Sequence, residues 1–152
     1  MLYSILFESH IVVSGVTLLS GIAIVVSSFR GWFHKKEYST FDIRLSLVFT
    51  LSLYLQLIIG LGIYFILRTN IEHPLLETES TTDNASLRFW AIEHIALNIF
   101  ALFLTQVGRI YIKKSKLSMK RFKASLFYYG ISLFLILFSL GVALFFRWLD
   151  CF

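Results

Sequence analysis

Four long runs of apolar residues constrain the fold of this chain more than any other feature. The runs are Ser9–Phe29, Leu45–Leu67, Phe89–Gly108 and Ala124–Phe146. The second and fourth runs contain no Asp, Glu, Lys or Arg. About 20 apolar residues, rising about 1.5 Å each, cross the hydrocarbon core of a bilayer as a helix. Because strands of a membrane β-barrel instead alternate over about ten residues, we expect an all-α membrane protein with four transmembrane helices.

The spacing of these runs predicts a single domain over residues 1–152. We place its helices at about 3–29, 41–68, 87–112 and 119–148, with an exposed acidic loop at 69–86. Only 15% of the residues are charged, whereas about a quarter are charged in soluble domains, so most of the surface should face lipid. The short first and third connections favour an up-down-up-down four-helix bundle.

The basic residues predict the orientation in the membrane. Eleven of the fourteen lie in the connections 30–44 and 109–123, and the second of these contains no Asp or Glu. By the positive-inside rule, both basic connections are cytoplasmic and both termini lie outside. Anionic lipid headgroups near these connections account for the net charge of +5. We therefore expect the lipid bilayer as a partner, and no nucleic acid.

Small and polar residues follow two histidines at helical spacing. Such residues let helices approach closely and form hydrogen bonds in lipid. After His10 come Ser14, Thr17, Gly21, Ile24 and Ser28, and after His94 come Asn98, Ala101, Thr105 and Gly108. The other two helices have similar stripes in Ser52, Gln56 and Gly60, and in Ser125, Tyr129, Ser132, Ser139 and Ala143. Each stripe should face the interior of the bundle.

The two histidines should lie at one level, about 10 Å below the outer membrane boundary, and face each other from diagonal helices. At the same level the flanking helices carry Gly60, Gly62 and Gly141. Glycines there would leave a slot for a flat macrocycle. Arginines that can pair with haem propionates lie at the outer rim: Arg68, Arg88 and Arg147. This pattern predicts haem b with His10 and His94 as ligands of the iron.

Two other interpretations remain open. A transition metal without haem could bind Glu8, His10, Glu93 and His94, although the Glu-x-x-His spacing of di-metal bundles is absent. Alternatively, the chain is a cofactor-free accessory subunit in which the histidines and glycines only pack and form hydrogen bonds. No nucleotide-binding or hydrolase motif occurs, so electron transfer or an accessory role is expected ahead of stand-alone catalysis.

Several segments together resemble a family of small four-helix inner-membrane proteins of Bacteroidota that are labelled cytochrome b-like. The segments are SILFESH, LQLIIGLGIYF, LRFWAIEHIALNIFALFLTQVGR and FYYGISL. The resemblance implies a bacterial inner-membrane protein, with periplasmic termini, that could belong to a respiratory or redox complex. A weaker likeness, to one half of haem A synthase, rests on Glu8, His10, Gln56, Gly60 and His94. It implies a haem-holding bundle, without synthase activity.

Overall fold

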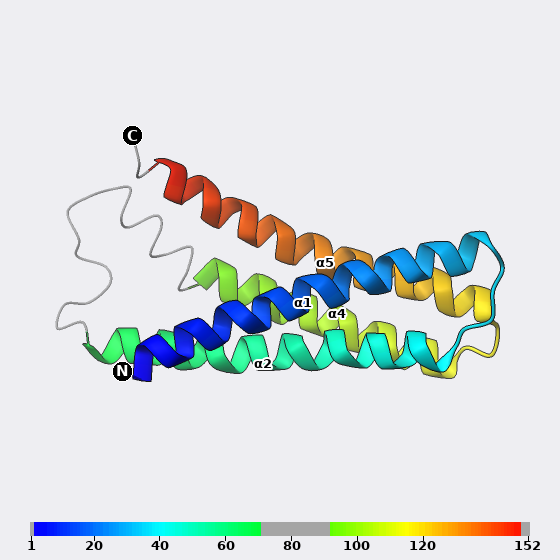
Figure 1. Ribbon diagram of the computed structural model, residues 1–152, viewed down its shortest axis with the longest axis horizontal. Helices are drawn as coiled ribbons and strands as arrows, with labels where there is room; N and C mark the ends of the chain where they lie inside the picture. The colour runs from blue at the N-terminus through cyan, green and yellow to red at the C-terminus, as the bar shows by residue number, and fades with distance from the viewer. Residues whose placement is uncertain (1, 71–91, 150–152) are drawn as a thin grey trace.

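A computed structural model describes residues 2–70 and 92–149 (Figure 1). The described part contains four long α-helices and no strand: α1 (Leu2–Phe33), α2 (Thr40–Asn70), α4 (His94–Lys114) and α5 (Ser118–Leu149). All four helices are long and apolar enough to cross a membrane. The all-α bundle expected from the sequence is confirmed. The expected start of the third helix, at residue 87, lies outside the described residues.

Helices that follow one another along the chain run in opposite directions along the long axis of the molecule (Figure 1). Helix α1 packs against α2 and α5, and α4 packs against the same two helices. The helices α1 and α4 therefore occupy diagonal corners, as expected for an up-down-up-down bundle. The α1–α2 and α4–α5 connections lie at one end, whereas α1 begins and α5 ends at the other.

The interior of the bundle is rich in hydroxyl groups, and its outer surface is apolar. Side chains of the expected stripes are buried on every helix, among them Thr17, Gln56, Thr105 and Ser132. Large apolar side chains point outward instead, with Leu19 71% and Phe134 65% exposed. This distribution is the reverse of a soluble core, because lipid solvates apolar side chains and leaves polar ones to pair inside.

Hydroxyl groups connect the helices across the core. The Oγ atoms of Ser28 and Ser125 lie 2.6 Å apart and join α1 to α5. Thr105 donates a hydrogen bond of 3.0 Å to Ser132 and joins α4 to α5. Ser132 in turn donates to the carbonyl oxygen of Ala101 at 2.9 Å. Since lipid offers no competing partner, these bonds fix the rotation of α1, α4 and α5 about their axes.

Three glycines bring helices into close contact, and two of them, Gly21 and Gly108, lie on the expected stripes. A Cβ atom added at Gly21 would lie 2.8 Å from a ring carbon of Phe49, and one added at Gly31 would overlap the ring of Phe122. A Cβ atom added at Gly108 would lie 2.7 Å from Cβ of Tyr128 on α5. Real side chains essentially never approach so closely. These positions therefore serve helix packing, as small residues do in membrane bundles.

The N-terminus of α2 is fixed by a buried acid in the first turn. The carboxylate of Asp42 accepts hydrogen bonds from the backbone N–H and the hydroxyl of Ser39, at 3.0 and 2.8 Å. The backbone N–H of Asp42 donates to Ser39 Oγ at 3.4 Å, which completes a capping box. Ser27 of α1 donates to the same carboxylate at 2.6 Å. The cap thus also joins α1 to α2 beside their connection.

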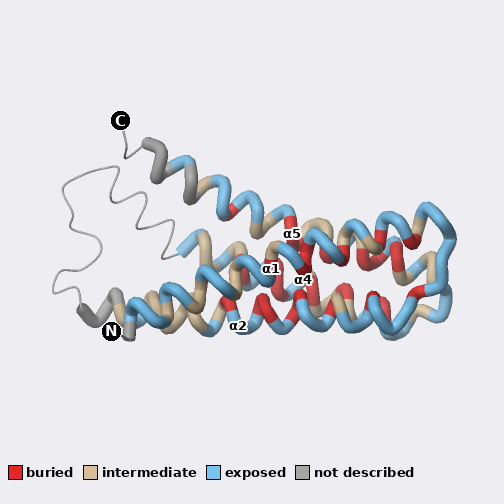
Figure 2. Tube along the Cα trace, viewed as in Figure 1, coloured by how far each residue is buried: buried red, intermediate tan, exposed pale blue. Residues whose placement is uncertain are grey.

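The tightly packed core ends at one level of the bundle. Figure 2 shows the buried residues in the middle and toward the two connections, with exposed and half-buried residues at the opposite end. Among the described residues, each helix has one buried side chain nearest that end: Thr17 on α1, Gln56 on α2, Asn98 on α4 and Ser139 on α5. Beyond this level α5 diverges from the other helices (Figure 1). The histidines lie at this boundary between core and open end.

Candidate functional site

The structure brings His10 of α1 and His94 of α4 together across the diagonal of the bundle. Their ring centroids are 6.4 Å apart and the ring planes are inclined at 61°. Both side chains are half-buried. The sequence pattern predicted this encounter, because both histidines head an inward stripe at the same depth.

His10 is held by Gln56, one of the last buried residues of α2. The amide nitrogen Nε2 of Gln56 lies 2.9 Å from Nε2 of His10 and donates a second bond of 2.5 Å to Ser14 Oγ. Because an amide nitrogen only donates, Nε2 of His10 accepts in this arrangement and the ring proton resides on Nδ1. Nδ1 of His10 and Oε1 of Gln56 are both buried and have no partner among the described residues. Nδ1 is a hydrogen-bond donor and Oε1 is an acceptor, so the site offers a bound group one of each.

His94 is oriented by side chains of two helices. Its Nδ1 lies 2.7 Å from Oγ of Ser139 on α5. The amide nitrogen of Asn98 donates to the carbonyl oxygen of His94 at 2.8 Å and lies 3.3 Å from its Nε2. Nε2 therefore accepts the longer bond and the Nδ1 proton is donated to Ser139. A histidine whose Nδ1–H is held in this way presents Nε2 as a metal ligand.

The spacing of the pair fits one metal atom between two imidazoles. A bond between a metal and an imidazole nitrogen is about 2 Å long, which places two ring centroids on opposite sides of the metal roughly 6 to 6.5 Å apart. The observed separation of 6.4 Å falls within that range. The donor set also fits, because two neutral imidazoles are normal axial ligands of haem iron.

The three glycines of the expected slot differ in what surrounds them. A Cβ atom at Gly60 would lie 3.3 Å from Cε1 of His10, so this glycine makes room for the histidine ring itself. At Gly62 the nearest side-chain atom, of Leu6, would lie at an ordinary 3.8 Å. Gly141 on α5 has no atom within 4 Å of such a Cβ and is exposed. Gly141 follows the inward-facing Ser139 by two residues, so its open space lies on the exposed face of α5 and not beside the histidine pair.

The remaining residues of the sequence hypothesis fall into two groups. The side chains of Arg68 and Arg147, and the whole of Arg88, lie outside the described residues. Glu8 and Glu93 are described, and both are exposed. Among the described residues, no three His, Cys, Asp or Glu side chains lie close enough to hold a metal ion.

Sequence reasoning placed Gln56, Asn98 and Ser139 on inward stripes but did not assign them to the histidines. The signal was present for Asn98, which follows His94 by four residues, one helical turn. It was absent for Gln56 and Ser139, because their pairing depends on the relative height and rotation of two helices. These three polar residues make the histidine pair a built site with defined ring orientations.

Comparisons with known proteins identify no relative: no family model matches the chain, and no curated protein or solved structure is significantly similar to it.

Proposed function

We propose that the protein is an integral-membrane, haem b-binding protein that transfers electrons or handles haem, with His10 and His94 as the two ligands of the iron. The observation that carries this proposal is the 6.4 Å separation of the two imidazoles across the bundle diagonal. When bound, haem would supply one-electron redox chemistry.

The chain's own contribution is to fix the ligands. Ser139 accepts a hydrogen bond from Nδ1 of His94, so Nε2 is the nitrogen that would bind iron, in place of its longer contact with Asn98. Gln56 donates a hydrogen bond to Nε2 of His10, the unprotonated nitrogen of that ring, so Gln56 would give way to iron at this atom and the protonated Nδ1 would remain a hydrogen-bond donor. A partner on the nitrogen that does not bind the metal, such as Ser139, sets the orientation and basicity of a ligating histidine, and so the affinity for the metal and its potential.

The proposal includes an orientation in the membrane. The two basic connections, within 30–44 and 109–123, lie together at one end of the bundle, which we assign to the cytoplasmic side of a bacterial inner membrane. The histidine pair then lies toward the periplasmic side. A single site near one face cannot carry electrons across the whole bilayer, which favours a role as a small subunit of a membrane redox complex.

The test is an absorption spectrum of the detergent-purified protein, recorded oxidised and then reduced with dithionite. We expect a sharp Soret band and split visible bands on reduction in the parent protein. Both features should be lost in His10→Ala and in His94→Ala. The matched control is His34→Ala, which removes an exposed histidine beside the α1–α2 connection and should leave the spectrum unchanged.

A cofactor-free accessory subunit is the second candidate, and one observation favours it. Both imidazoles already have hydrogen-bond partners, Gln56 for His10 and Ser139 for His94. On this interpretation the pair only joins helices. A colourless protein purified from haem-replete cells, with no metal by elemental analysis, would establish it and refute haem binding.

A further inference from the structure

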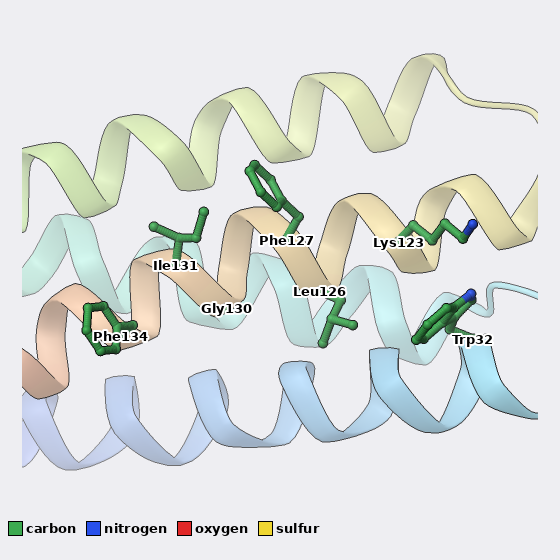
Figure 3. Close-up of a pocket in the computed structure, with 7 residues that line it drawn as sticks. All are labelled: Trp32, Lys123, Leu126, Phe127, Gly130, Ile131 and Phe134. Atoms are coloured by element: carbon green, nitrogen blue, oxygen red, sulfur yellow. The ribbon is translucent and has the colours of Figure 1, made fainter.

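An apolar groove runs along the membrane-facing side of α5, between the α4–α5 connection and the level of the histidine pair. It has a volume of about 540 Å³ and is lined by Trp32, Lys123, Leu126, Phe127, Gly130, Ile131 and Phe134. Figure 3 shows Trp32 of α1 and Lys123 of α5 together at one end, with their nitrogen atoms directed the same way. Gly130 forms part of the floor, and a Cβ atom there would meet no atom within 4 Å.

We propose that this groove binds one anionic phospholipid, with an acyl chain along α5 and the headgroup phosphate at Lys123. The first argument is length. From Lys123 to Phe134 the helix rises about 16 Å, and half of a typical hydrocarbon core is about 15 Å. The groove therefore spans one leaflet, as a single acyl chain does.

The second argument is charge. Lys123 is exposed at the basic end of the groove, and its ammonium group lies 5.8 Å from the centroid of the Trp32 ring. Residues 109–123 contain seven basic residues and no acidic one, so the segment offers no carboxylate to neutralise this lysine. Tryptophan is characteristic of the membrane–water interface, where headgroups lie. A phosphate at this position would complement the charge and lie at the correct depth.

A lipid fits this groove better than a second copy of the chain. A symmetric dimer through this face would bring Lys123 and the other basic residues of each copy toward those of its partner. Like charges facing each other oppose association. The same charges would instead raise the affinity for an anionic lipid, and each lysine near its phosphate would add to that affinity.

The experiment is native mass spectrometry of the detergent-purified full chain, titrated with phosphatidylglycerol or with phosphatidylcholine of the same acyl chains. We expect one phosphatidylglycerol to bind with higher affinity than phosphatidylcholine. Lys123→Gln should weaken phosphatidylglycerol binding about fivefold, the factor expected for one lysine at an anionic surface. The control Lys116→Gln removes the same charge from the same basic segment but outside the groove, and should leave affinity within twofold.

A second pair of variants tests the apolar part of the groove. Gly130→Leu fills the floor and should reduce binding of both lipids, whereas Gly15→Leu, at another glycine without neighbours within 4 Å, should not. Equal affinity for the two lipids in the parent protein, or equal losses in Lys123→Gln and Lys116→Gln, would overturn the proposal. So would a dimer that Gly130→Leu dissociates, because it would show that a second copy occupies the groove.

Discussion

The contact between α4 and α5 at Gly108 offers a direct test of how this bundle is held together. In Gly108→Ala the new methyl group would lie 2.7 Å from Cβ and 3.1 Å from Cγ of Tyr128. An ordinary contact begins at 3.4 Å, so atoms next to the α5 backbone would have to move by several tenths of an ångström. The end of a flexible side chain could yield, but Cβ cannot move without its helix. The two helices must therefore separate locally.

Overpacking of this kind costs about 1–3 kcal/mol, and we expect the upper half of that range because backbone must shift. Alanine favours a helix over glycine by about 1 kcal/mol, which offsets part of the cost. The net expectation is a loss of about 1–2 kcal/mol in the free energy of unfolding. Gly15→Ala is the matched control, since its methyl group would meet no atom within 4 Å. It should gain up to about 1 kcal/mol from propensity alone.

The assay is reversible unfolding in mixed micelles, followed by far-ultraviolet circular dichroism as the fraction of denaturing detergent increases. Both variants replace a helical glycine with alanine, so they share the same gain in helix propensity. The difference between their free energies of unfolding therefore measures the steric cost alone, and it should be about 2–3 kcal/mol. If Gly108→Ala is as stable as Gly15→Ala, the close approach of α4 and α5 at this glycine is refuted.

Three further predictions concern the end of the bundle near the connections. Asp42→Ala should destabilise the protein by about 1–2 kcal/mol, because it removes the α2 cap and the acceptor for Ser27. Amide hydrogen exchange should then rise first at the N-terminus of α2, and a uniform rise along the chain would contradict this role. Burial raises the pKa of Tyr38 above its ordinary 10.0, so its phenol stays protonated in the folded chain while the unfolded chain ionises. Its contribution to stability should therefore be intact below pH 10.0 and lost as pH rises above it, and unfolding measured against pH should show a smaller loss in Tyr38→Phe. A double-mutant cycle on Ser28→Ala and Ser125→Ala should give a coupling energy of about 0.6 kcal/mol, the average for such hydrogen bonds in membranes. A coupling energy of zero would show that the bond between the two serines does not stabilise the bundle.

The sequence by itself determined the four helices and the faces they turn inward. Helix length follows from the apolar runs, and the inward face follows from the helical repeat, and both are local properties of the chain. The same repeat placed His10 and His94 at one level on diagonal helices. The stripe residues Thr17, Asn98 and Ser139 are buried as expected, because in lipid the polar side of each helix has nowhere else to pair.

Only the tertiary structure decided which side chains meet across the helices. Pairing Gln56 with His10, and Ser139 with His94, requires the correct height and rotation of each helix to within about an ångström, and a repeat of 3.6 residues cannot specify that. The same reason explains why Gly60 accommodates the His10 ring instead of lining an empty slot. Local chemistry thus fixed the elements and their faces, whereas the close approach of the packed helices fixed the site.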